Sequence, residues 1–314
     1  MIQRLHGILV WLALCLSGLQ TQAQGIKVHI VSSQASAPYL DAAQALIKGL
    51  SSHGVARSEI QVMSLADFSN VSPVALPTGK VWVALGTQAA AALAKAQLRG
   101  ASVLSALIPG SGFERVLRQS GRQASAQFNA IYLDQPLQRQ LVLIRLALPR
   151  AKRVAVLWGP ESWNRADTLR TLANTHGLVL RDARLKVESD LFAALQSVLD
   201  GSDVLLAQAD PLVFNSSSIQ NILMTSIRDK VPLVAFSPAY VRAGALLAIY
   251  STPTQVGTQA ARWVLDVLAQ RTLPEQAMAP DDFEISVNLE VARVLNLPLD
   301  AGQLQLSLKR LEQP

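Results

Sequence analysis

The chain has 314 residues, half of them apolar, and its 28 lysines and arginines against 22 aspartates and glutamates give a formal net charge of +6. A basic protein can bind nucleic acid. Here, however, the basic residues are scattered, as at Arg115, Arg139 and Arg184, and no aromatic residues are interleaved with them. We therefore exclude a nucleic-acid partner and interpret the charge as a solvated surface.

The first 23 residues have the parts of a cleavable secretory signal peptide. A short basic start is followed by the apolar stretch Ile8–Leu19, and Thr21 and Ala23 precede a predicted cleavage site before Gln24. The apolar stretch has about a dozen residues, fewer than the roughly 20 that span a bilayer. An uncleaved membrane anchor is the alternative. We expect an exported, periplasmic protein.

Cys15 is the single cysteine of the chain. It lies inside the apolar stretch and follows Leu14, whereas a lipoprotein signal has a small residue directly before its cysteine. We therefore expect no lipid anchor. The exported part has no cysteine, so its core must stabilise the fold without disulfides.

Short apolar runs alternate with helical periodicity from residue 27 to residue 148. Strands are expected at Lys27–Ser32, Gln61–Leu65, Val81–Leu85, Val103–Ile108 and Ala130–Leu133. Helices are expected from about Pro38, over Gln88–Gln97 with Thr87 as N-cap, after the loop Pro109–Gly112, and from Pro136 to Leu148. The first helix is expected to bury one apolar face, formed by Leu40, Ala43, Ile47 and Leu50.

The same alternation begins again after residue 153. Strands are expected at Val154–Trp158, Val179–Leu185, Val204–Ala207, Leu233–Phe236, Ala245–Tyr250 and Phe283–Val287. Helices are expected after Pro160, over Leu191–Leu199, Ser218–Asp229 and Thr254–Gln270, and from Asn288. Apolar strands separated by helices are typical of a parallel sheet covered on both faces. Two such runs predict two doubly wound α/β lobes of about 140 residues each.

Residues for catalysis or metal binding are missing from this pattern. His29, His53 and His176 are the only histidines after residue 23, and no two are spaced as metal ligands. There is no G-x-S-x-G motif. The loop Pro109–Gly112 lacks the lysine of a phosphate-binding loop, so it is either a tight turn or a ligand contact. We predict no catalytic residue, metal or cofactor.

Small polar and turn residues follow the expected strands. The carboxyl ends of parallel strands are where ligands bind in open α/β sheets. The candidate ligand-binding residues are Ser33, Tyr39, Gly86, Thr87, Gly110, Ser111, Ser162, Trp163, Asp210, Phe236 and Ser237. Thr87 and Ser162 would receive the polar end of the ligand. Asp210 would either pair with an amine or cap a helix before Pro211. Aromatic residues, Trp158 and Tyr240 among them, would either stack on a flat ligand or belong to the core.

The last third of the chain carries an ordered set of motifs. They are Val231–Phe236, Gly244–Leu246, Tyr250, Gly257 with Ala260–Ala261, Ile285–Leu289, Ala292 and Leu295–Pro298, and Gly86–Thr87 and Val154–Leu157 precede them. In this combination the chain resembles the ABC-transporter substrate-binding proteins, the family that includes aromatic amino-acid binders.

The resemblance implies a type I periplasmic-binding-protein fold whose two lobes close on a solute about a three-segment hinge. Crossovers are implied near Leu133–Pro136, Tyr250–Pro253 and Pro280–Phe283. The implied boundaries are 24–133 for the first lobe, 134–250 for the second, 251–281 for a return to the first, and 282–314 for a segment with the second.

The chain departs from the family at two places. Ile108-Pro109-Gly110 stands where members usually have an acidic Thr-Asp-Pro, and Gln127–Ala130 replaces an Asn-x-Thr-Gly segment. The family's ligand contacts in the first lobe therefore cannot be transferred to this chain.

These observations predict a monomeric periplasmic receptor that delivers a small organic solute, such as an amino acid, to an ABC permease in the inner membrane. The same fold as the sensory input of a signalling system is the alternative. An exported enzyme is less favoured, because the sequence offers no general base or nucleophile.

Overall fold

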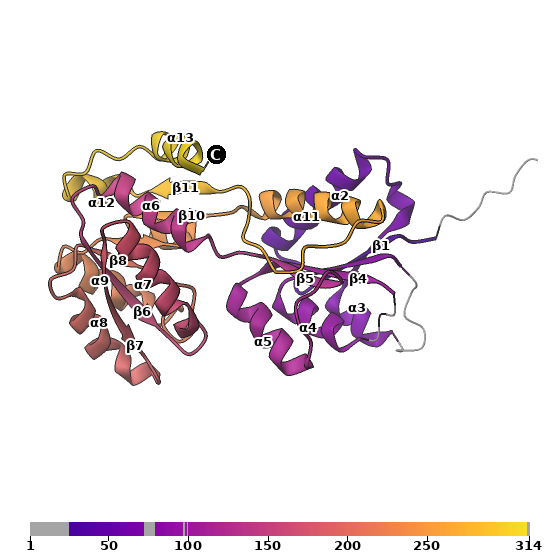
Figure 1. Ribbon diagram of the computed structural model, residues 1–314, viewed down its shortest axis with the longest axis horizontal. Helices are drawn as coiled ribbons and strands as arrows, with labels where there is room; N and C mark the ends of the chain where they lie inside the picture. The colour runs from indigo at the N-terminus through magenta and orange to yellow at the C-terminus, as the bar shows by residue number, and fades with distance from the viewer. Residues whose placement is uncertain (1–24, 72–78, 97, 99, 313–314) are drawn as a thin grey trace, which may run out of the picture.

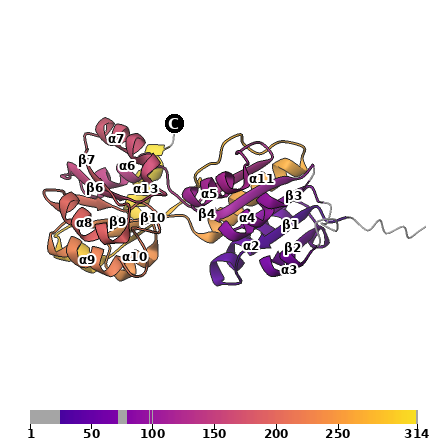
Figure 2. The ribbon, with the colours of Figure 1, turned by 90° about the horizontal axis from the view of Figure 1, so that it is seen from below.

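The computed structural model describes residues 25–71, 79–96, 98 and 100–312. These residues form two α/β lobes joined by a narrow connection (Figures 1 and 2). The predicted fold class, two mainly parallel doubly wound sheets, is confirmed. The signal peptide predicted over residues 1–23 lies outside the described residues.

The first sheet is parallel, with strand order β2-β1-β3-β4-β5. Its strands are β1 (Val28–Ser32), β2 (Ile60–Ser64), β3 (Val81–Leu85), β4 (Ser102–Ile108) and β5 (Phe128–Tyr132). The helices α2 (Ala37–Ser51) and α11 (Pro253–Leu268) cover one face. The helices α3 (Leu65–Asn70), α4 (Thr87–Lys95) and α5 (Gly110–Ser120) cover the other. A short 3-10 helix, η1 (Arg57–Glu59), precedes β2.

The second sheet has the order β11-β10-β9-β8-β6-β7, with only the β10–β11 pair antiparallel. Its strands are β6 (Arg153–Trp158), β7 (Val179–Arg184), β8 (Val204–Leu206), β9 (Leu233–Ala235), β10 (Leu247–Tyr250) and β11 (Glu284–Val287). One face carries α6 (Leu137–Ala147), α7 (Ala166–Thr175), α12 (Leu289–Val294) and α13 (Ala301–Glu312). The other face carries α8 (Leu191–Leu199), α9 (Ile219–Arg228) and α10 (Pro238–Ala243). The short 3-10 helices are η3 (Trp163–Arg165) and η4 (Glu188–Asp190).

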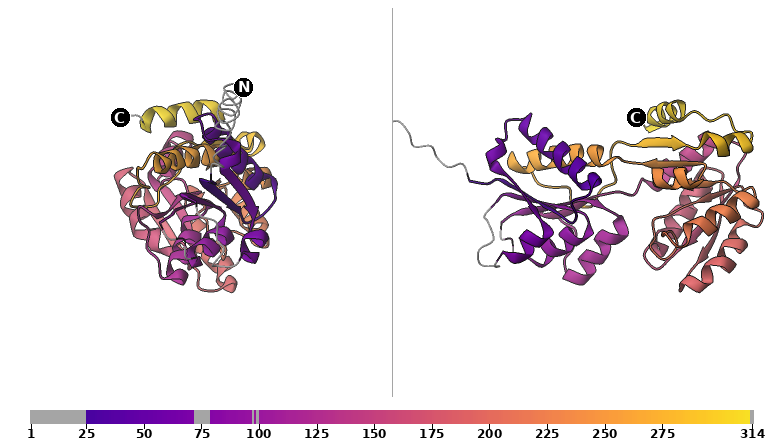
Figure 3. Two further views of the ribbon diagram at one scale, coloured as in Figure 1. Left: turned by 90° about the vertical axis from the view of Figure 1, so that its right-hand side faces the viewer. Right: turned by 180° about the vertical axis from the view of Figure 1, so that it is seen from behind.

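The helix α11 packs against α2, although more than 200 residues separate their starts (Figure 3). Small residues allow the backbones to approach: a Cβ built on Gly257 would lie 2.3 Å from the Ala42 carbonyl oxygen. The buried face predicted for α2 is confirmed at Ala43 and Leu50 and is wrong at Leu40. Ala42 and Leu46 are fully buried beside α11, whereas Leu40 is 50% exposed. The lobe boundaries at residues 133/134, 250/251 and 281/282 stay predictions.

The start of α4 differs from the prediction. Gly86, with φ of 90°, is the N-cap, and Thr87 is the first helical residue. The cap hydrogen bond comes from a distant residue, because Ser33 Oγ accepts from Ala89 N at 2.9 Å. The predicted loop Pro109–Gly112 is also wrong, since Pro109 is the N-cap of α5 and helix begins at Gly110.

In the described ranges, no helix is long and apolar enough to cross a membrane. Within the same residues, no group of three or more histidine, cysteine, aspartate or glutamate side chains could hold a metal ion.

Candidate functional site

A cavity of about 490 Å³ lies at the junction of the lobes, where strand carboxyl ends of both sheets meet the connecting segments. Apolar walls come from Pro109, Leu133 and Phe236, and Ser237 lies beside them. Two larger cavities, of about 580 and 620 Å³, are lined by the second lobe alone. Ligand sites in such folds lie between lobes at strand carboxyl ends, so we take the junction as the candidate site and name it the hinge cavity.

Four predicted residues of the first lobe lie together at the start of α4. A Cβ on Gly86 would lie 2.7 Å from Tyr39 Cε1 and 2.8 Å from Ser33 Oγ, so only glycine fits there. Thr87 Oγ1 lies 3.1 Å from a Cβ built on Gly112, which brings the amino ends of α4 and α5 side by side. Burial raises the pKa of the Tyr39 hydroxyl.

Gly110 is tied to a carboxylate that the sequence analysis did not select. Its N–H donates to Asp134 Oδ2 at 2.6 Å, and Arg165 Nη1 donates to Asp134 Oδ1 at 2.8 Å. Asp134 lines the hinge cavity, and Arg165 comes from η3 in the second lobe. The residues Asp134-Gln135-Pro136 predicted only a helix start, so the bonds of Asp134 to Gly110 of α5 and to Arg165 of η3 had no local sign in the sequence. Ser111 follows Gly110 in the first turn of α5 and is partly buried.

Two further polar contacts join α5 to the segment after β6. Arg115 forms an ion pair with Glu161, and Asn164 Nδ2 donates to Glu114 Oε2 at 3.0 Å. With the Arg165–Asp134 pair they connect the lobes on one side of the junction.

In the second lobe, Asp210 and Ser162 bind each other. Ser162 is 1% exposed and Asp210 is 2% exposed. Asp210 Oδ2 accepts from Ser162 Oγ at 2.8 Å and from Glu161 N at 3.0 Å, and Oδ1 accepts from Leu212 N at 3.0 Å. No helix begins at Pro211, so the predicted N-cap role of Asp210 is wrong. The carboxylate instead holds the loops after β6 and β8 together.

The candidate aromatic residues separate into core and cavity. Trp158 is fully buried and donates to Asp182 Oδ2 at 2.9 Å, which places it in the core. Trp163 packs on the second-lobe core, with the Arg184 guanidinium 5.1 Å from its ring centroid. Phe236 lines the hinge cavity.

Phe236 belongs to a small aromatic cluster. Its ring centroid lies 5.0 Å from that of Tyr240 and 6.0 Å from that of Phe214, both in edge-to-face geometry. Tyr240 OH donates to the Phe214 carbonyl at 3.3 Å, and burial raises its pKa. These contacts favour a fixed Phe236 ring as an apolar wall.

The polar floor of the hinge cavity was missed by the sequence analysis. Gln208 Nε2 donates to Gln140 Oε1 at 2.7 Å, Gln140 Nε2 donates to the Gln135 carbonyl at 2.8 Å, and Gln135 Nε2 donates to Ser251 Oγ at 2.9 Å. All four residues line the cavity. They come from different segments, and isolated glutamines form no motif, so only the tertiary structure brings them together.

Tyr132, at the end of β5, gives the folded state a pH-dependent stability. Burial, followed by the Glu114 and Asp134 carboxylates, raises the pKa of Tyr132 from 10.0 to about 12. The folded state holds the Tyr132 proton more tightly than the unfolded state does. The protonated hydroxyl therefore contributes fully to the free energy of unfolding below pH 10, and this contribution is lost as the pH rises towards 12. We expect Tyr132→Phe to lose less stability than wild type between pH 9 and 11.5, measured by urea unfolding. Equal losses would contradict this.

A family model described as ABC transporter substrate binding protein matches residues 27–302. The chain belongs to this family. The predicted resemblance is thus confirmed. A tyrosine-binding protein of Clostridioides difficile (strain R20291) is 22% identical over 191 residues, which are 60% of this chain and 54% of the relative. The chain therefore spans about half the length of this curated relative.

Solved structures of ABC-type substrate-binding proteins share the fold. A ligand-free, open substrate-binding protein with adhesive properties from Clostridium difficile has a TM-score of 0.68 at 16% identity, covering 88% of this chain and 97% of that one. An ABC domain in complex with L-Trp from Streptococcus pneumonia has a TM-score of 0.60 at 15% identity, covering 89% and 97%. At these identities the likeness shows the fold alone.

Proposed function

We propose that this substrate-binding protein is exported to the periplasm, binds a small organic solute in the hinge cavity and presents it to an ABC permease. The observation that carries the proposal is the cavity itself, lined by strand ends of both lobes and by the segments that join them. Closure of the lobes about those segments would be the signal that the permease recognises. In this proposal the chain binds solute without catalysis, since the cavity is lined by amides, hydroxyls, apolar walls and the Asp134 carboxylate, which Arg165 and Gly110 already bind.

The cavity favours a solute with a flat apolar part and a polar edge without net charge. Phe236 offers a ring face or edge, and the floor amides can both donate and accept. Asp134 is the one charged residue among the described residues lining it, and Arg165 and Gly110 already bind its carboxylate. A singly charged solute would leave either Asp134 or Arg165 without its partner.

A thermal-shift screen tests this function. The protein would be collected by osmotic shock, and mass spectrometry would check for a mature chain beginning at Gln24. The probes are L-tryptophan, L-tyrosine, adenosine, uridine, citrate and D-ribose. A solute at 100 times its dissociation constant stabilises the folded state by about 2.7 kcal/mol. We expect a shift with one of the flat solutes, and no shift with any probe would sink the proposal.

Phe236→Ala should weaken the affinity for that solute at least about tenfold and reduce the thermal shift accordingly, because a partly buried aromatic ring that covers a bound solute contributes on the order of 1.5 kcal/mol or more. Phe192→Ala is the control, since Phe192 lies on α8, is 62% exposed and does not line the cavity. Equal losses of affinity in the two variants would place the solute elsewhere.

A further inference from the structure

Arg139 is a buried arginine with hydrogen-bond partners in distant segments. It lies in the first turn of α6 and is 7% exposed, so the expectation of a solvated surface is wrong for this residue. Nη1 donates to Gln135 Oε1 at 2.8 Å and to the Pro280 carbonyl at 3.0 Å, and Nε donates to Glu312 Oε1 at 2.5 Å. The guanidinium also lies 4.5 Å from the Phe283 ring centroid. A buried charge needs such partners to offset its desolvation.

Through Gln135 this guanidinium is connected to the floor of the hinge cavity. The Gln135 side chain accepts from Arg139 with its oxygen and donates to Ser251 with its nitrogen. Ser251 Oγ in turn donates to the Asp282 carbonyl. The connection from β5 to α6, the connection from β10 to α11 and the segment before β11 are therefore joined by one hydrogen-bond network. We name these three connections the hinge segments.

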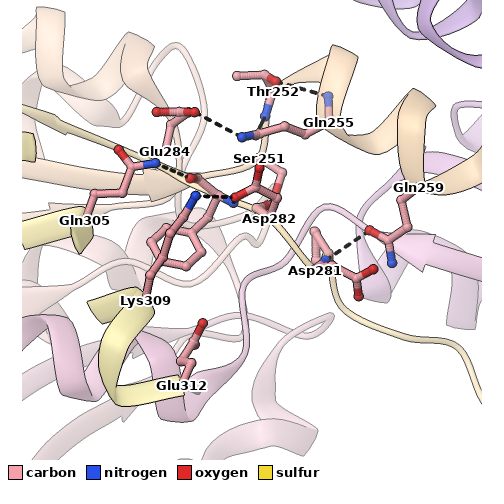
Figure 4. A network of polar contacts seen from close by, with 12 residues as sticks. Ser251, Thr252, Gln255, Gln259, Asp281, Asp282, Glu284, Gln305, Lys309 and Glu312 are labelled. Atoms are coloured by element: carbon pink, nitrogen blue, oxygen red, sulfur yellow. Dashed lines mark hydrogen bonds and ion pairs between the residues drawn. The ribbon is translucent and has the colours of Figure 1, made fainter. Parts of the chain in front are cut away.

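The C-terminal helix α13 also binds the third hinge segment (Figure 4). Lys309 Nζ lies 2.7 Å from Asp282 Oδ1, and Gln305 Nε2 donates to the Phe283 carbonyl at 2.8 Å. Leu304 and Leu308 of the same helix are buried in the second-lobe core. The counterion of Arg139, Glu312, is the last residue of this helix. The position of α13 thus decides whether Arg139 keeps its ion pair.

We propose that Arg139 is the positioning residue of the hinge: it fixes Gln135 at the cavity floor and the Pro280 carbonyl in the third hinge segment, while Glu312 of α13 balances its charge. A change at the floor amides is then transmitted to all three hinge segments. Because one guanidinium binds both the floor and the hinge, the angle between the lobes is coupled to occupancy of the cavity. This regulation rests on the proposed function, but its test needs no solute.

The test measures the distance between the lobes in the free protein. Cysteines introduced at the exposed positions Gln119 on α5 and Thr168 on α7 would carry spin labels, in a full chain with Cys15→Ser. We expect Arg139→Met to broaden the distance distribution. Amide hydrogen exchange in the hinge segments should also rise about tenfold, as expected for a locally destabilised unit.

The matched control is Arg145→Met on the same helix, whose guanidinium donates at 3.0 Å to Ala151 within the second lobe. It should leave the distance distribution unchanged. If Arg139 had only a structural role, Arg139→Met would lower the melting temperature without broadening the distribution of distances between the lobes. That result would overturn the proposal. If Arg139→Met does not fold, Gln135→Ala and Glu312→Gln keep the arginine and should broaden the distribution. Wild-type distributions in both would equally overturn it.

These outcomes are separate from those of the solute screen. A screen without any shift would count against the proposed function and leave the hinge measurement standing. A narrow distribution in the Arg139, Gln135 and Glu312 variants would remove the hinge role and leave solute binding intact.

Discussion

Gly257→Ala is expected to destabilise the first lobe by about 2 kcal/mol. In most helices this substitution stabilises, because alanine has a higher helix propensity by about 1 kcal/mol. Here the new Cβ would lie 2.3 Å from the Ala42 carbonyl oxygen and 3.0 Å from Ala45 Cβ. The nearer atom belongs to the backbone of α2 and cannot rotate away, so overpacking costs about 1–3 kcal/mol and outweighs the propensity gain.

Gly302→Ala on α13 is the control for this prediction. Its nearest neighbour would be the Asp300 side chain at 3.3 Å, and the position is exposed. It should gain a few tenths of a kcal/mol up to about 1 kcal/mol from helix propensity. Urea unfolding followed by far-UV circular dichroism measures both variants. A stabilised Gly257→Ala protein would show that α11 does not pack on α2 as described.

Asp210→Ala is expected to lower the stability of the second lobe by about 3 kcal/mol. The carboxylate accepts from Ser162 Oγ, Glu161 N and Leu212 N while 2% exposed. Removing it leaves these donors without their acceptor, and each unsatisfied buried donor costs about 1–3 kcal/mol before water or local relaxation compensates. Gly159→Ala should disturb the same loops, because its Cβ would lie 2.1 Å from Asp210 Oδ1.

Asp300→Ala provides the comparison for Asp210. Asp300 Oδ1 accepts one backbone hydrogen bond, from Gln303 N at 2.7 Å, at an exposed helix start. Its loss should cost about 1 kcal/mol. Thermal unfolding and hydrogen exchange of residues 159–162 measure the difference. Equal effects of the two substitutions would mean that Asp210 is not the connection between the two loops.

Much of the fold could be predicted from local pattern. Val81–Leu85 is a strand at its predicted bounds, and Leu191–Leu199 is a helix at its predicted bounds. In both segments the apolar residues recur at the period of the element, so the local pattern predicts the secondary structure without knowledge of the tertiary contacts. The helices α3, α10 and α13 were not predicted. The first two have only six residues each, and the third follows a proline-containing segment.

The location of the candidate site at the strand ends could be predicted from the sequence, but most of the residues that line it could not. Strand ends provided Phe236 and Ser237, which line the hinge cavity, and the group around Gly86. The floor amides and Asp134 were missed, because a glutamine or aspartate has the same local pattern whether its side chain faces solvent or a cavity. Asp210 was selected as a candidate because it could offer a free carboxylate to a ligand. In the structure that carboxylate instead accepts hydrogen bonds from donors of its own lobe.

The sequence by itself determined the repeated strand-and-helix order, the two α/β lobes and the strand ends at which a ligand site would lie. Each of these depends on periodicity and turn residues within about 20 positions of one another. The tertiary structure alone decided that α11 packs on α2, that Arg165 pairs with Asp134 across the junction, and that Arg139 reaches Glu312. Those contacts join residues from 31 to more than 200 positions apart, and their energy comes from burial and charge pairing that no local pattern contains.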